Sequence, residues 1–133
     1  MLAPYFAENQ HPDHVAASKL TRDACRFARY GGLEELKPLA VHKISSLYYY
    51  NITSHLGRTP DILIDISDVA EEWDAVMHCH ESQVTHKSYI DLQKAAARLL
   101  GLSIGVEYAM GVFANDPIRL DGLSDLTLSS RNF

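Results

Sequence analysis

The chain has 133 residues, which is enough for one domain with a substantial buried core and too short for two independent domains. Its formal net charge is −5, from 17 acidic and 12 basic residues, and this charge argues against binding to nucleic acid. No apolar run is long enough to span a membrane, and the N-terminus lacks the basic start and apolar stretch of a signal peptide. We therefore expect a single cytoplasmic domain over residues 1–133 that binds no nucleic acid and no membrane, with both cysteines as free thiols.

Patterns of strands and helices alternate along the first half of the chain. Residues 2–6 are predicted to end a buried strand, and a helix is expected from about His14 with Asp13 as its N-cap. Two further strands are predicted at residues 46–52, which are rich in aromatic side chains, and at residues 62–66. This alternation is typical of an α/β fold.

The second half of the chain is predicted to be mostly helical. A capping box that begins at Asp68 should start a helix that runs to about His80. Ser88 should cap a longer helix that ends within residues 104–108. The last 20 residues are predicted to be loop, with a short strand near residues 118–120.

The most informative pattern is His11-Pro12-Asp13-His14, hereafter the histidine block, which lies between the first strand and the first helix. Open α/β sheets place ligand sites at such junctions, beyond the carboxyl ends of their strands. Imidazole is a good zinc ligand, and a neighbouring carboxylate can fix the tautomer and charge of a histidine. On the residues alone, two interpretations stay open: a ligand site, and a capped helix start with two exposed histidines.

A second group of histidines, in His78-Cys79-His80, is predicted to bind no metal. Residues two positions apart on a helix point about 200° apart around its axis, so His78 and His80 cannot share one ion. No Cys-x-x-Cys pair accompanies them. We therefore expect a solvated helix end in which Cys79 is buried.

The histidine block resembles a block of the PIG-L/LmbE family of zinc-dependent N-acetylglucosamine (GlcNAc) deacetylases. The likeness extends along the chain and is similar to the bacillithiol-biosynthesis branch of that family, whose members remove acetyl from N-acetylglucosaminyl malate. The segments that carry this likeness are residues 3–5, 15–20, 47–50, 64–69, 82–83 and 104–108.

The resemblance implies a Rossmann-like parallel sheet with flanking helices and a GlcNAc conjugate as the small-molecule substrate. His14 aligns with a zinc ligand, and His11 aligns with the histidine that assists the tetrahedral intermediate as an acid or oxyanion partner. Asp13 aligns with the carboxylate that orients and charges that histidine. The implied cofactor is Zn²⁺, which makes water acidic near neutral pH and polarises the acetamide carbonyl. Family members often form homo-oligomers, so the resemblance also implies a homo-oligomer.

The resemblance further implies that part of the family's site lies outside this chain. The family's N-terminal block, His-Pro-Asp-Asp, supplies two zinc ligands and the general base, and this sequence contains no copy of it. We therefore expect the C-terminal part of a deacetylase domain, without its N-terminal strand block and inactive on its own. Such a part should leave a sheet edge and apolar helix faces exposed to water.

One local difference from the family concerns substrate recognition. The family's Tyr-Arg-Ser-Gln is replaced here by His80-Glu81-Ser82-Gln83, which exchanges a positive charge for a negative one. That exchange can weaken recognition of an acidic substrate such as a malate glycoside. Two alternatives to the deacetylase stay open: a related amide hydrolase that acts on another sugar conjugate, and a non-catalytic remnant or oligomerising module.

Overall fold

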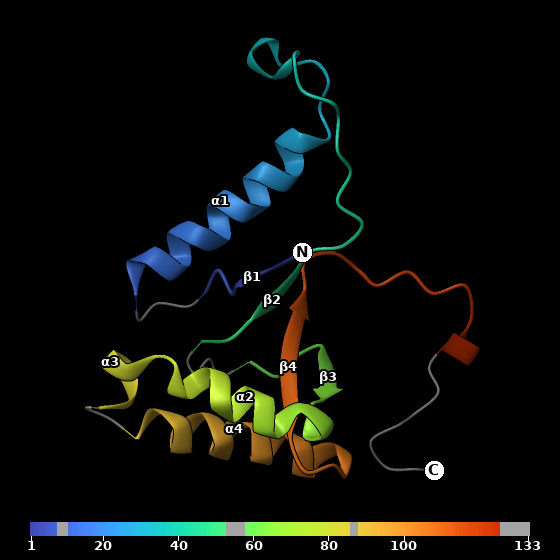
Figure 1. Ribbon diagram of the computed structural model, residues 1–133. Helices are drawn as coiled ribbons and strands as arrows, with labels where there is room; N and C mark the ends of the chain where they lie inside the picture. The colour runs from blue at the N-terminus through green and yellow to red at the C-terminus, as the bar shows by residue number, and fades with distance from the viewer. Residues whose placement is uncertain (8–10, 53–57, 86–87, 126–133) are drawn as a thin grey trace. The chain divides into compact units, whose positions relative to one another are not determined.

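The computed structural model describes residues 1–7, 11–52, 58–85 and 88–125, which form strands and helices in alternation (Figure 1). Their order is β1 (Leu2–Pro4), α1 (Pro12–Ala28), β2 (Tyr48–Tyr50), β3 (Ile62–Asp65), α2 (Ala70–His78), α3 (Glu81–Val84), α4 (Tyr89–Ile104) and β4 (Ala109–Ala114). Single turns of 3₁₀ helix lie at Glu34–Leu36, Ser67–Val69 and Leu123–Asp125. The predicted α/β class is therefore confirmed, and no helix in the described part of the chain is long and apolar enough to cross a membrane.

The strands form a four-stranded sheet in the order β1-β2-β4-β3. β1 pairs with β2 in parallel, whereas β4 pairs with β2 in antiparallel orientation. The expectation of a parallel sheet is therefore correct for β1 and β2 and wrong for β4. An apolar pattern identifies a strand but not its direction, and a mixed sheet is a common variant of the α/β fold.

The C-terminal part of the chain differs from the prediction. Residues 109–114, for which no strand is predicted, form β4, and residues 118–120 form no strand. β4 reads Ala-Met-Gly-Val-Phe-Ala, a nearly continuous apolar run without polar alternation. Such a short run cannot be distinguished from buried helix by its periodicity.

The chain divides into two compact units, which are described separately. Unit 1 comprises Met1–Thr59 and Val112–Ile118, and unit 2 comprises Pro60–Gly111 and Arg119–Phe133. The first half of β4 therefore belongs to unit 2 and the second half to unit 1.

The core of unit 1 is an aromatic cluster on one face of its strands. Ala3, Tyr49 and Phe113 lie directly opposite one another across β1, β2 and β4, and each is at most 2% exposed. Tyr5 lies two residues after Ala3, so it projects from the same face and stacks on Phe113 with ring centroids 4.3 Å apart. Burial of this face fixes the register of β1 on β2, because a shift by one residue would turn these side chains to the other face.

Helix α1 begins two residues earlier than the apolar pattern indicates. Its N-cap is His11 and not the predicted Asp13, and the His11 Nδ1 atom accepts the Asp13 backbone N–H at 3.3 Å. Pro12 occupies the first helical position, where its fixed φ suits a helix and its missing N–H costs nothing. Asp13 therefore lies in the first turn, where a carboxylate interacts favourably with the helix dipole.

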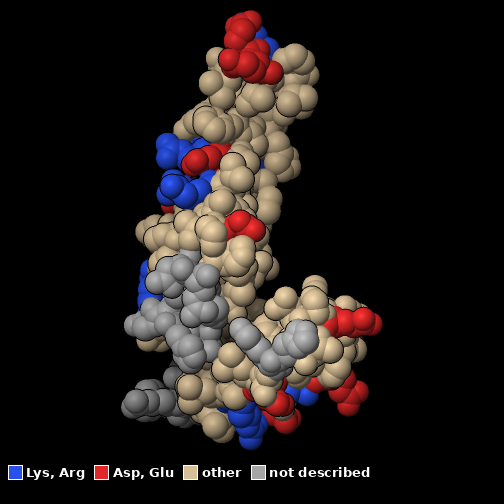
Figure 2. Space-filling model, turned by 90° about the vertical axis from the view of Figure 1, so that its left-hand side faces the viewer, with Lys and Arg blue, Asp and Glu red and all other residues tan. Residues whose placement is uncertain are grey.

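The surface of α1 combines charged and apolar side chains. Leu20 is 70% exposed and Phe27 is 49% exposed, although both belong to the apolar residues of this helix. On the face of the molecule in Figure 2, uncharged side chains cover most of the surface, and Lys and Arg lie in small groups with Asp and Glu beside them. Apolar side chains are therefore exposed on α1.

In unit 2, a side chain of β3 caps the turn that precedes α2. The Asp65 carboxylate accepts the Ser67 backbone N–H at 2.9 Å and the Ser67 hydroxyl at 2.6 Å. The hydroxyl bond, with the backbone bond second, lowers the pKa of Asp65. The predicted capping box at Asp68 is therefore wrong, because a 3₁₀ turn comes first and α2 starts only at Ala70 without a side-chain cap.

Two glycines determine how α4 ends. Gly105 has φ +78°, a left-handed conformation that glycine adopts without strain, and it ends the helix as its C-cap. A Cβ on Gly101 would lie 2.7 Å from the Glu107 carbonyl oxygen, so only glycine permits the chain to pass this closely. The helix therefore ends at Ile104, within the predicted range.

The described cysteines are free thiols, as predicted, but they differ in exposure. Cys25 is half-buried on α1, whereas Cys79 is exposed at the end of α2. The expectation that Cys79 is buried is wrong. Helix α2 ends at His78, two residues before its predicted end, and the Cys79 thiol donates to the Ala75 carbonyl oxygen of its own helix at 3.4 Å.

Candidate functional site

The histidine block lies at the start of α1, which follows β1 in the chain (Figure 1). The His11 and His14 rings have centroids 5.2 Å apart, and Asp13 Oδ2 lies 3.6 Å from His11 Nδ1. The structure therefore brings all three predicted site residues together. The side chains of His11 and Asp13 are 57% and 84% exposed, so their attraction is screened by water.

The two contacts of His11 require different protonation states. As a cap, Nδ1 accepts the Asp13 N–H and carries no proton, so the proton of the neutral ring is on Nε2. When the ring is protonated, Nδ1 loses its role as acceptor and faces the Asp13 carboxylate instead. Asp13 can thus compensate the positive charge that His11 gains, and the protonated ring can then give up its Nε2 proton and become neutral again.

His14 differs from His11 in its environment. Its Nδ1 atom is buried and has no hydrogen-bond partner among the described residues. The same holds for Ser18 Oγ, one turn further along the same face of α1, and for Asn51 Oδ1, directly after β2. Most buried polar atoms in proteins have partners, so each of these atoms calls for an explanation. A bound ligand, ion or water would satisfy them.

The buried nitrogen of His14 fits the role of a metal ligand, since neutral imidazole binds zinc through a ring nitrogen. A catalytic zinc ion typically has about three protein ligands. The described residues contain no group of three or more His, Cys, Asp or Glu side chains that could hold a metal ion. The described residues therefore fit one position of a zinc site, at His14, and provide no complete set of ligands.

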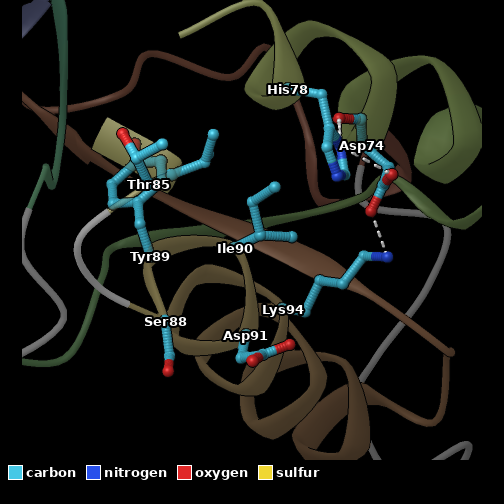
Figure 3. Close-up of a pocket in the computed structure, with 9 residues that line it drawn as sticks. Asp74, His78, Thr85, Ser88, Tyr89, Ile90, Asp91 and Lys94 are labelled. Atoms are coloured by element: carbon cyan, nitrogen blue, oxygen red, sulfur yellow. Dashed lines mark hydrogen bonds and ion pairs between the residues drawn. The ribbon is translucent and has the colours of Figure 1, made fainter. Parts of the chain in front are cut away.

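Unit 2 contains a second collection of ionisable side chains, around an open groove of about 740 Å³ (Figure 3). Asp74, His78 and Lys94, hereafter the Asp74 cluster, lie on one side of Ile90 in the close-up. Thr85, Ser88 and Tyr89 lie on its other side. None of these residues belongs to the histidine block.

The Asp74 cluster is held by contacts between α2 and α4. Asp74 Oδ1 forms an ion pair with Lys94 Nζ, and His78 Nδ1 lies 2.9 Å from the Asp74 carbonyl oxygen and 3.2 Å from Oδ2. The ion pair lowers the pKa of Asp74 and raises that of Lys94, so both are charged at neutral pH. A carbonyl oxygen only accepts, so His78 Nδ1 carries a proton in this contact.

Sequence reasoning identifies only part of the Asp74 cluster. Asp74 and His78 are four residues apart on a helix, and this spacing predicts that their side chains are neighbours. Lys94 lies on a different helix, and its place depends on how α2 packs against α4. A pattern within a single helix does not contain that information.

Comparison with known proteins finds similar solved structures, whereas no protein-family model matches the chain. The conserved protein TT1542 from Thermus thermophilus has a TM-score of 0.76 and 27% identity, over 90% of this chain and 52% of that chain. GalB, the 4-carboxy-2-hydroxymuconate hydratase from Pseudomonas putida, has a TM-score of 0.70 and 18% identity, over 92% of this chain and 54% of that chain. The chain thus spans about half the length of each, and both likenesses agree with the α/β fold.

Proposed function

We propose that this chain is part of a zinc-dependent N-deacetylase of the PIG-L/LmbE kind. Its substrate would be a GlcNAc conjugate such as N-acetylglucosaminyl malate. The observation that carries the proposal is the buried, unpartnered Nδ1 of His14 at the start of α1, with the His11 ring beside it. Retaining a buried polar atom without a partner costs stability, and a role as metal ligand would account for it.

The residues of the histidine block can divide the work of hydrolysis. Hydrolysis adds water to the acetamide and breaks its C–N bond, so a proton must reach the departing amine. His11 can take up a proton and pass it from Nε2 to the departing amine, which returns the ring to its neutral form, and the Asp13 carboxylate, 3.6 Å from Nδ1, would stabilise the protonated ring. His14 would be one zinc ligand, and the metal, when bound, would supply Lewis acidity for this reaction.

We further propose that the 133-residue chain is inactive alone. The proposal rests on the resemblance, in which His-Pro-Asp-Asp supplies two further ligands and the general base, because this sequence has no such block. Loss of a general base alone typically reduces turnover by about 10²–10⁴-fold.

Zinc analysis and an assay with N-acetylglucosaminyl malate on the purified chain test this proposal. We expect less than stoichiometric zinc and no turnover. A second preparation, in which a family N-terminal half containing His-Pro-Asp-Asp is joined to this chain, should bind zinc and release acetate. Stoichiometric zinc with steady turnover from the 133 residues alone would contradict the proposal.

An oligomerising module is the second candidate function. It is favoured by large apolar side chains that are exposed on helices, among them Leu20 on α1 and Leu99 on α4, which are 70% and 72% exposed. Such side chains normally become buried in an interface. The molar mass in solution, measured by light scattering over a range of concentrations, tests this candidate, which requires an assembly larger than the monomer.

A further inference from the structure

The groove in unit 2 has a wall of charged and polar groups whose charges nearly cancel. The negative charge of Asp74 is paired with the positive charge of Lys94. His78 donates Nδ1–H to the Asp74 carbonyl oxygen. Of the described lining residues, Asp91 adds the remaining formal charge. The groove therefore has no excess positive charge, which a phosphate or carboxylate ligand would need.

The same wall presents hydrogen-bond donors and acceptors side by side. Lys94 has three ammonium protons, of which Asp74 takes one, and the Asp74 carboxylate is an acceptor. The hydroxyl groups of Ser88 and Tyr89, on the other side of the groove, can both donate and accept (Figure 3). An apolar ligand would remove water from these groups without replacing its hydrogen bonds, at a cost in affinity.

We infer that this groove binds a neutral, polyhydroxylated small molecule such as a monosaccharide. Each hydroxyl group of such a ligand both donates and accepts, which matches a wall where the Lys94 ammonium and the His78 ring both contact the Asp74 carboxylate, an acceptor. Hydrogen bonds to charged groups are the stronger kind, and Asp74 holds both of these side chains in place. Ile90 and the ring of Tyr89 offer apolar surface for the C–H groups of a sugar.

The size of the groove agrees with this ligand class. Its volume of about 740 Å³ lies within the usual range of small-molecule sites, roughly 300–1,000 Å³. Because the groove is open to solvent, a bound sugar keeps part of its hydration, and we expect a dissociation constant in the millimolar range. This site goes beyond the proposed function, since it includes none of the residues of the histidine block and its test requires no catalysis.

The experiment is a titration of the ¹⁵N-labelled 133-residue chain with D-glucose, D-galactose and N-acetylglucosamine, followed by NMR. At least one of these sugars should cause saturable shifts of backbone amides around Asp74, His78 and Ser88–Lys94. Lys94→Met should weaken that binding by about tenfold or more, because it removes a charged donor. Lys37→Met is the matched control: it removes the ammonium group of an exposed ion pair with Glu34 in unit 1 and should leave the binding unchanged.

Lys94→Met also breaks the ion pair between α2 and α4 and can unfold the chain. A milder variant then tests whether the groove is the binding site. Tyr89→Phe removes a single hydroxyl group and should weaken sugar binding by about threefold to tenfold. Titrations with inorganic phosphate and with putrescine, on the same samples, should cause no saturable shifts at these amides.

Three results would overturn the inference. The first is the absence of saturable shifts with every sugar. The second is saturable sugar binding that neither Lys94→Met nor Tyr89→Phe weakens, which would place the ligand elsewhere. The third is binding of phosphate or putrescine in the groove without binding of any sugar, which would assign it to a charged ligand.

Discussion

Replacing His14 with leucine should stabilise the 133-residue chain. A buried polar atom without a hydrogen-bond partner costs about 1–3 kcal/mol, and His14 Nδ1 is such an atom among the described residues. Leucine fills much of the same space without the polar atom. Since part of the gain is lost to imperfect packing, we expect the free energy of unfolding to rise by about 1 kcal/mol. A residue retained for ligand binding at the expense of stability behaves in this way.

The assay is urea unfolding followed by circular dichroism, with a chelator present so that trace metal does not occupy the site. Ser18→Ala is a parallel variant, because Ser18 is 1% exposed and its hydroxyl is also without a partner among the described residues; it should be stabilised to a similar extent. Tyr49→Phe is the contrast. The Tyr49 hydroxyl donates to Asn115 Oδ1 at 2.9 Å, so its removal should cost about 0.5–1.5 kcal/mol.

The result that would refute this reasoning is a loss of more than about 1 kcal/mol for His14→Leu, with no gain for Ser18→Ala. The imidazole ring would then support the fold through interactions of its own. The buried nitrogen would no longer indicate a ligand, and the block would be an ordinary helix start with two histidines.

Three further predictions concern packing, pH and metal binding. Gly101→Ala should lower the free energy of unfolding by about 1–3 kcal/mol in urea titrations, because a Cβ would meet the Glu107 carbonyl oxygen at 2.7 Å. The bond from Ser67 lowers the pKa of Asp65 below its usual 3.8, so the stability it gives is present above pH 3.8 and is lost as the pH falls further. Ser67→Ala should therefore flatten the acid limb of a plot of unfolding free energy against pH. In the protein joined to a His-Pro-Asp-Asp half, substituting His78 and His80 together should leave zinc stoichiometry unchanged, whereas loss of one equivalent would reveal a site there.

The elements whose signals are local could be predicted from the sequence. The aromatic run at residues 48–50 and the apolar run at residues 62–65 form strands, because their side chains favour a half-buried pleated surface. The closeness of His11 and His14 also follows from local rules, since residues three apart share one face of a helix. The apolar pattern predicts the start of that helix two residues too late, although Pro12 at the first helical position is itself a local signal.

The features that depend on tertiary contacts could not be predicted in this way. β4 is identified by its partner β2, with Phe113 opposite Tyr49, and not by an alternation in its own sequence. Asn51 Oδ1 is buried without a partner among the described residues, and its burial depends on which segments pack around the end of β2. Lys94 reaches Asp74 only because α2 packs against α4.

The most direct test of the central proposal compares two single substitutions in the protein joined to a family His-Pro-Asp-Asp half. Zinc stoichiometry and acetate release from N-acetylglucosaminyl malate are measured for each. His14→Ala should lose zinc, because it removes a ligand. His11→Ala should keep zinc and lose turnover by about 10²–10⁴-fold, the usual effect of removing an acid–base group. If His11→Ala emptied the metal site and His14→Ala left it full, or if neither changed turnover, the roles assigned to the histidine block would be contradicted.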